Sequence, residues 1–431
     1  MNISRFELDN GLRTVVASYE GTKAVTIEVA VATGFGYETG SNRGVSHLVE
    51  HMIFRGSKSR DSIVDISAYV ESLGGYVNAS TDRDVTTYFT YTPVEGFAQA
   101  CEVLGDILQN PKFAEADCNL EKQIIVDELR IARDTPEDWA SQNLDYLLWP
   151  NHGLGVPVST DIENIEGLLP LHLRRHMNDV YVASNMVVGI AGDIDTSHAR
   201  SVVQKAFGGI PSGAPTVWPA VDRNIGSNLF CEDRNVMQTS FVIGAGTLGN
   251  EDPDKYVLEI LNAVLGDGMG SRLFTNIREK RGLAYDIYSG LYQYRDTGAL
   301  TISATVSPEV ALETIDATIE QCHALSMDPP TDHELRRAFE YVKGGLVLSM
   351  EHSSNVASWH TREELLENYK MTVDEVVHKL AEVGKRDVAL AADKLFRSEK
   401  LCLSVVGPNP PEAQLSNLLS RRTKGAMNAS I

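Results

Sequence analysis

The feature that most restricts the fold of this chain is an internal repeat, because its second half follows the first in outline. The strand pattern that ends near Thr33 has a counterpart in Phe241–Gly246, and the apolar strand 186–192 has one in 401–407. Matching segments are offset by about 212 to 215 residues throughout. A repeat of this kind indicates two copies of one structural plan.

The stretch most typical of a linker is Gly208–Pro215, which is rich in glycine and proline. At 431 residues the chain is also too long for one ordinary core. We therefore predict an N-terminal module, residues 1–212, that carries the functional site, and a homologous C-terminal module, residues 213–431.

Periodicity predicts mixed secondary structure in each copy. An Asn-Gly turn closes a predicted hairpin over residues 6–16, and Gly74-Gly75 ends a predicted helix. The prediction is an α+β protein of two homologous α/β modules, each a mostly antiparallel sheet packed with helices. In the first copy the expected strands are 25–33, 76–81, 85–92 and 185–192, and the expected helices are 61–73, 96–109, about 116–133 and 168–177.

Composition argues against several classes of partner. Lysine and arginine total 38 against 59 acidic residues, a formal net charge of −21, which disfavours nucleic acid and anionic membranes. The five cysteines are scattered without a Cys-x-x-Cys pair, so neither a disulfide framework nor a thiolate zinc site is indicated. No apolar stretch reaches the length of a membrane span, and no leader pattern precedes the first strand. We expect a cytoplasmic protein.

The sequence His-Leu-Val-Glu-His at His47–His51 carries the strongest chemical signal. On a helix, two histidines four residues apart lie one turn apart on one face, which Glu50 shares; Ser46 is the predicted cap. Two imidazoles so placed can bind zinc, and a neighbouring carboxylate can act as a general base. An amphipathic helix with merely polar histidines is the alternative. The second copy has approximately Glu259 and Ala263 at these places, so only the first copy can bind the metal.

The predicted helix over about 116–133 offers further ligands. Glu121 and Glu128 are seven residues apart, which is two turns, so both carboxylates point the same way. A solvated acidic stripe is the alternative. A catalytic zinc site usually has three protein ligands and one open position, so this helix is a candidate source of the third ligand.

These segments, together with Gly75–Thr81 and Arg278–Tyr285, resemble the pitrilysin/insulinase family of inverzincin zinc metallopeptidases. The resemblance covers nearly the whole chain and is closest to short, single-module members similar to the mitochondrial processing peptidase β subunit. It implies a metallopeptidase fold of the LuxS/processing-peptidase-like type.

The resemblance also implies the roles of individual residues. One Zn²⁺ per chain would be bound by His47, His51 and Glu128, with Glu50 as general base and Glu121 as a supporting carboxylate behind the ligands. Relatives can carry manganese or cobalt in vitro, and the ligand set alone does not distinguish these ions from zinc.

Two further pairs of residues are implied to contact substrate. Asn78 and Ala79 lie on a strand that is an open edge in relatives, where an extended peptide can add through backbone hydrogen bonds. Arg278 and Tyr285 resemble the pair that the family's second half supplies to the substrate or to the tetrahedral intermediate. Without the resemblance, Arg278 would be a surface cation and Tyr285 a half-buried strand residue.

Because the zinc motif and the Arg-Tyr pair occur in one chain, the resemblance favours a homodimer that encloses a chamber. A heterodimer with a related subunit is the alternative. The long glycine-rich loop of the mitochondrial α subunit is replaced by Gly266–Gly270, which argues against presequence cleavage in mitochondria.

The predicted function is a zinc-dependent endopeptidase that hydrolyses short unstructured peptides. One alternative is a dedicated precursor-peptide processing protease working with a non-catalytic partner subunit. Another is a non-catalytic structural subunit, as in the core proteins of respiratory complexes. Such subunits commonly lose ligands, whereas the motif here is intact.

Overall fold

The computed structural model describes residues 1–156, 162–222, 228–367, 370–397 and 400–427. The chain forms two compact units. Their boundary lies at Pro219, seven residues after the predicted one, and each unit includes one segment from the other half of the sequence. The first unit comprises Met1–Leu129, Val158–Pro219 and Leu348–Lys370, and the second comprises Arg130–Pro157, Ala220–Val347 and Met371–Ile431.

The sheet of the first unit has six strands in the order β1-β2-β6-β3-β5-β4. Only the β2–β6 pair is parallel, so the sheet is mostly antiparallel as predicted. The predicted hairpin is present, and Gly11 in its turn has a φ of +89°, which glycine adopts without strain. The strands are β1 (Asn2–Glu7), β2 (Arg13–Ser18), β3 (Ala24–Val31), β4 (Tyr76–Thr81), β5 (Thr86–Pro93) and β6 (Met186–Gly192).

The sheet of the second unit repeats this plan with the order β7-β11-β8-β10-β9. Its parallel pair is β7–β11, which matches β2–β6, and the remaining pairs are antiparallel. The internal repeat seen in the sequence is therefore a repeat of topology. The strands are β7 (Asn228–Asp233), β8 (Thr239–Leu248), β9 (Asp286–Gln293), β10 (Thr297–Val306) and β11 (Leu401–Gly407).

Helices cover both faces of each sheet. In the first unit they are α1 (Val45–Ile53), α2 (Ile63–Ser72), α3 (Phe97–Gln109), α4 (Glu115–Asp134, which continues past the end of this unit), α6 (Ile162–Gly167), α7 (Pro170–Val180), α8 (Thr196–Phe207) and α12 (Ser353–Leu366). In the second unit they are α5 (Pro136–Leu148), α9 (Lys255–Leu265), α10 (Ala311–Met327), α11 (Asp332–Ser349), α13 (Val373–Glu382), α14 (Lys385–Leu395) and α15 (Glu412–Met427).

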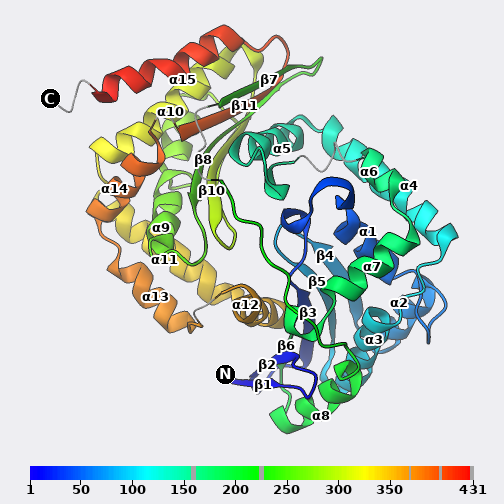
Figure 1. The fold of residues 1–431 in the computed structure, drawn as a ribbon. Coiled ribbons are helices and arrows are strands. Elements are labelled where there is room, and N and C mark those ends of the chain that lie inside the picture. Colours follow the sequence, from blue (N-terminus) through cyan, green and yellow to red (C-terminus); the bar gives the residue numbers. More distant parts are fainter. Residues whose placement is uncertain (157–161, 223–227, 368–369, 398–399, 428–431) are drawn as a thin grey trace. The chain divides into compact units, whose positions relative to one another are not determined.

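Alternation along β3 divides the first sheet into two differently packed faces. Val25, Ile27 and Val29 belong to the main apolar core, which includes residues of α1, α3 and α7. The opposite face carries Thr26 and Glu28 and lies against α12, a helix contributed by the second half of the sequence (Figure 1). Successive strand residues point to opposite faces, so one short strand serves both layers.

Each sheet is covered on one face by a helix from the other half of the sequence, α12 in the first unit and α5 in the second. Helix α12 packs on its sheet through apolar side chains such as Val356 and Leu365. It also makes polar contacts: Thr26 Oγ1 lies 2.8 Å from Ser353 Oγ, and Arg362 donates at 3.3 Å to the buried Asp84 in the turn between β4 and β5. Helix α5 packs on β8 and β11 through apolar contact of Leu144. Sequence periodicity alone did not predict this exchange. None of the helices that the structure describes is long and apolar enough to cross a membrane.

Candidate metal centre

Helix α1 begins differently from the sequence prediction. Its N-cap is Gly44, which has a φ of +79°, and Ser46 lies buried in the first turn, so the prediction of Ser46 as cap is wrong. The carboxylate of Glu38 accepts hydrogen bonds from the backbone N–H groups of Gly44 (2.6 Å) and Ser46 (2.8 Å). A carboxylate from the preceding loop thus accepts hydrogen bonds from N–H groups at the helix start, the role that a capping side chain usually has.

The structure brings together the three predicted metal ligands. His47 Nε2 lies 3.2 Å from His51 Nε2 and 3.7 Å from Glu128 Oε2, and the latter two atoms are 3.8 Å apart. Donors at about 2.0–2.1 Å from a tetrahedral zinc ion are separated by about 3.4 Å, so this donor set fits zinc. In the part of the chain that the structure describes, this is the one group of acidic, histidine or cysteine side chains that could hold a metal ion.

The second imidazole is oriented by the other carboxylate of α4. His51 Nδ1 lies 2.7 Å from Glu121 Oε2, and the Glu121 side chain is only 5% exposed. A carboxylate that accepts the Nδ1–H leaves the Nε2 lone pair directed at the other donors. The ring of His47 lacks such a partner on Nδ1 among the described residues and instead meets the edge of Phe35, with ring centroids 5.9 Å apart.

Burial and hydrogen bonds together shift the pKa values in this cluster. Burial, helped by the neighbouring His51, lowers the pKa of His47 to about 4, which keeps this ring neutral at pH 7. Burial disfavours the charged form of Glu121, but hydrogen bonds with His51 and Arg55 outweigh it and lower the pKa. Metal binding requires an unprotonated imidazole nitrogen, and His47 meets this condition.

Glu50 points toward the edge strand β4. Burial raises its pKa, while a hydrogen bond with Thr81 of that strand acts in the opposite direction. The hydroxyls of Tyr88 and Tyr181 lie 2.7 Å apart, and burial together with the Glu50 charge raises the pKa of both phenols. A raised pKa makes a carboxylate a stronger base, which suits a group that accepts a proton and later returns it.

Strand β4 forms one edge of the first sheet, since its only partner is β5. The backbone N–H of Ala79 donates to Asn78 Oδ1 at 2.9 Å and therefore points away from β5. In an antiparallel strand alternate residues direct their backbone groups outward, so Ala79 offers a backbone donor at the open edge. The same strand contacts Glu50 through Thr81.

Arg278 and Tyr285 lie together in the second unit. Arg278 belongs to the π-helical turn η7 (Phe274–Glu279), and its guanidinium lies 4.6 Å from the ring centroid of Phe274 and 5.1 Å from that of Tyr285. Tyr285 directly precedes β9 and is 83% exposed rather than half-buried. The Arg278 side chain is 33% exposed, and its Nε lies 3.7 Å from Glu279 Oε1.

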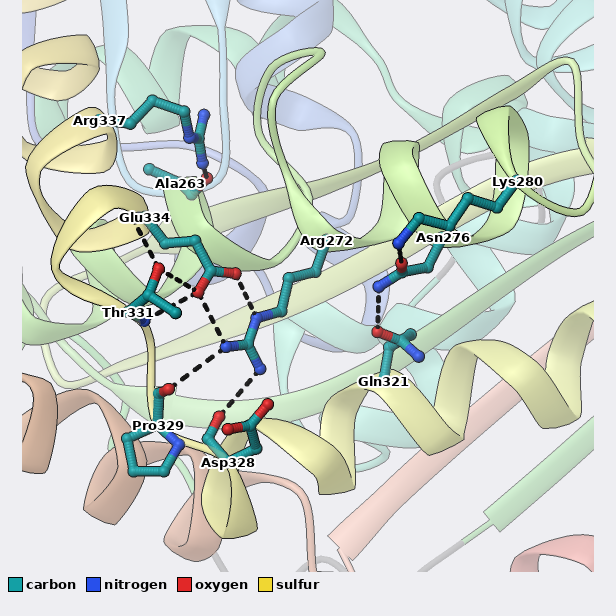
Figure 2. Close-up of polar contacts among 10 residues, drawn as sticks. All are labelled: Ala263, Arg272, Asn276, Lys280, Gln321, Asp328, Pro329, Thr331, Glu334 and Arg337. Atoms are coloured by element: carbon teal, nitrogen blue, oxygen red, sulfur yellow. Dashed lines mark hydrogen bonds and ion pairs between the residues drawn. The ribbon is translucent and has the colours of Figure 1, made fainter.

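A polar network fixes the segment that carries Arg278 (Figure 2). The guanidinium of Arg272 donates to Glu334 at 2.7 and 3.1 Å and to the carbonyl oxygens of Asp328 and Pro329. Four residues later, Asn276 donates to Gln321 at 2.7 Å. The residues just before this turn and in its first half are therefore anchored to α10, to the segment that follows it and to the start of α11.

Sequence reasoning missed Glu38, Arg55 and Thr81. Glu38 and Thr81 lie outside the motif, and nothing in their local sequence indicates which side chain they meet. The position of Arg55 could have been predicted, because it lies four residues after His51, as His51 lies four residues after His47, and so shares their face of the helix.

Comparison with known proteins agrees with the geometry. Residues 13–161 match the profile described as insulinase (peptidase family M16), and residues 170–341 match the peptidase M16 inactive domain. The uncharacterized zinc protease YmxG of Bacillus subtilis is 31% identical over 409 residues, 94% of this chain and 98% of that protein. This chain belongs to peptidase family M16.

A second relative and two solved structures are also similar to this chain. The uncharacterized zinc protease SCO5738 of Streptomyces coelicolor is 29% identical and covers 94% of this chain, with 90% of its own length aligned. Among solved structures, a protease from Helicobacter pylori has a TM-score of 0.89 at 20% identity, over 94% of this chain and 99% of that one. A chain of Complex III2 from Candida albicans has a TM-score of 0.83 at 16% identity, and the match covers 98% of this chain and 99% of that one. Likenesses at this identity establish the fold alone.

Proposed function

We propose that this M16 chain is a zinc-dependent endopeptidase that hydrolyses short unstructured peptides. The observation that carries the proposal is the convergence of His47, His51 and Glu128, with Glu50 beside them and next to an open strand edge. The zinc protease names of the relatives support the same chemistry.

Each residue of the centre has a distinct role in this proposal. His47, His51 and Glu128 would hold one zinc ion, and Glu121 keeps His51 oriented toward it. When bound, zinc would supply Lewis-acid activation of water and of the peptide carbonyl. Glu50 accepts a proton from the attacking water and returns it to the departing amide nitrogen as the C–N bond breaks.

Peptide substrates would bind as an added strand on β4. Ala79 presents an outward backbone N–H, and Asn78 already occupies that donor with its side-chain oxygen, which an incoming carbonyl would replace. Such binding depends on backbone groups and demands little of the substrate sequence. Two peptides of one sequence, N-methylated on the odd or on the even backbone nitrogens, therefore test the site. The peptide whose methyl groups face β4 should bind more weakly, and the other should bind normally. Equal binding of the two peptides would contradict the β4 site.

For the second unit we propose the role that the family resemblance implies. Arg278 and Tyr285 would donate hydrogen bonds to substrate from within a homodimer that encloses a chamber. Mass-resolved sizing of the purified chain tests the homodimer against a heterodimer with a related subunit. A chain that is monomeric and gains activity only with a second protein would favour the precursor-processing alternative.

The deciding experiment is Glu50→Gln in the full-length chain. We expect peptide cleavage to fall by about 10²- to 10⁴-fold while zinc remains bound, because the substitution removes the general base and leaves the ligands in place. A chelator should abolish wild-type cleavage, and added zinc should restore it. Zinc-loaded wild-type protein that cleaves no unfolded peptide would favour the structural-subunit alternative.

A further inference from the structure

Arg55 extends the metal-binding face of α1 by one further turn. The helix ends at Ile53, and the backbone N–H of Arg55 still donates to Met52 O at 3.1 Å. The guanidinium contacts one oxygen of Glu121 through both Nε and Nη2. The other oxygen of Glu121 contacts His51 Nδ1. One carboxylate thus bridges a guanidinium and a ligand imidazole.

The charges in this chain of contacts show why the guanidinium matters. The Glu121 side chain is 5% exposed and that of Arg55 is 21% exposed, so neither charge is fully solvated. A buried carboxylate is costly without a cation. His51 must be neutral to bind a metal ion, and in that state it gives Glu121 a hydrogen bond but no positive charge. Arg55 is the other group in ionic contact with Glu121 among the described residues, and it stays charged.

Two donors on one oxygen also restrict how the carboxylate can turn. A lysine ammonium would hold the charge as a point, whereas the guanidinium presents Nε and Nη2 in a fixed plane. With one Glu121 oxygen held in this way, the second oxygen is directed at His51 Nδ1.

We propose that Arg55 is a positioning residue of the metal centre, holding Glu121 in the orientation that presents His51 Nε2 to the ion. This inference rests on the proposed zinc site. It assigns to Arg55 an effect on zinc affinity that acts through Glu121, and not only a contribution to the stability of the fold.

The first measurement is zinc affinity by chelator competition in the full-length Arg55→Met variant. We expect affinity to fall on the order of 10-fold, the range found for groups that orient metal ligands. Arg55→Lys should recover part of the loss. The matched control is Arg60→Met, which removes a guanidinium paired with Glu102 at 2.7 Å and with Asp106 at 3.2 Å, outside the metal centre. Its zinc affinity should equal that of the wild type.

The second measurement is a double-mutant cycle between Arg55→Met and Glu121→Gln. If Arg55 acts through Glu121, its substitution should have no further effect on zinc affinity once Glu121 is changed. Unchanged affinity in Arg55→Met, or losses that simply add in the double variant, would overturn the inference while leaving the zinc site intact. A wild-type chain that binds no zinc would instead reject the proposed function, and this inference with it.

Discussion

Helices α1 and α9 occupy equivalent places in the repeated topology, yet among the described residues only α1 contributes to a candidate metal centre. Each follows the equivalent strand of its sheet, β3 or β8. Where α1 has His47 and His51, α9 has Glu259 and Ala263 at the repeat offset. Ala263 is fully buried, and its carbonyl oxygen accepts a hydrogen bond from Arg337 (Figure 2). The comparison teaches that the repeated fold positions a helix without specifying its chemistry.

The residues around the two helices differ in charge as well. At the same offset, Arg55 after α1 corresponds to Asp267 after α9. Burial and then the negative charge of Asp267 raise the pKa of Glu259 to about 7, with Lys255 acting in the opposite direction. The first unit therefore surrounds its helix with a cation, a carboxylate and imidazoles, and the second unit places two acids near each other. The two copies therefore differ in the charges around this helix as well as in the ligands on it.

The substitution with the largest expected effect on zinc binding is His51→Ala, which gives α1 the residue found at the equivalent position of α9. We expect zinc affinity to fall by more than about 100-fold, because loss of a direct ligand exceeds the loss of an orienting group. Metal analysis after dialysis measures it. The reverse substitution, Ala263→His, should leave the zinc content unchanged, since the described residues around α9 include no group of converging ligands. Retained zinc in His51→Ala would contradict the ligand assignment.

A second contrast concerns the helices exchanged between the units. A Cβ at Gly189 of β6 would overlap Thr361 Oγ1 of α12, whereas one at Gly244 of β8 would lie 2.7 Å from a terminal methyl of Leu144 in α5. A terminal methyl can move more easily than a hydroxyl next to the helix backbone. We expect Gly189→Ala to lower the free energy of unfolding by about 2–3 kcal/mol and Gly244→Ala by about 1 kcal/mol.

Chemical unfolding of the full chain measures both substitutions. Gly344→Ala in α11 is the control, since nothing lies within 4 Å of its added Cβ, and alanine should stabilise this helix by up to about 1 kcal/mol. Equal losses at Gly189 and Gly244 would show that the two interfaces tolerate overpacking alike.

The smallest expected effect concerns Glu259 of α9 and the pH dependence of stability. The unfolded chain releases the Glu259 proton near the ordinary value of 4.5, whereas the folded protein keeps it up to about pH 7. The stability that this carboxyl contributes is therefore fully present below pH 4.5 and is lost as the pH rises through 7. Glu259→Gln should leave stability unchanged at pH 4 and raise it at pH 8 by about 1–2 kcal/mol, less than the whole pKa shift would give because the side chain is only partly buried by surface area. Equal stability of the two proteins at both values would show that Glu259 is more solvated than its burial indicates.

Much of the fold followed from local pattern. The predicted strand over 76–81 is β4, and the predicted helices over 96–109 and about 116–133 are α3 and α4 within one or two residues. Side-chain periodicity reports which face of an element is buried, so it locates long elements well. The repeat then indicated two similar sheets, and the five-stranded second sheet repeats the order of the first without a counterpart of β1.

Helix spacing also predicted most of the candidate metal centre, but it did not identify the third ligand. Helix geometry alone placed His47, His51 and Glu50 on one face, because spacing along a helix fixes direction. The same geometry left Glu121 and Glu128 equivalent, and only the family resemblance chose between them. The structure separates them by distance, since Glu121 meets the Nδ1 side of His51 and Glu128 meets the Nε2 side.

The sequence by itself determined which elements form, that they form twice, and which copy carries the imidazoles, because each of these depends on residues close together in the chain. Only the tertiary structure decided that α5 and α12 cover the sheet of the other half, that Glu38 accepts the first N–H groups of α1, and that Arg55 holds Glu121. The helix exchange and the Arg55–Glu121 contact join residues far apart in sequence, and the Glu38 contact depends on how a loop folds back onto the helix start. A buried charge or backbone group pairs with whichever partner the packing brings within reach.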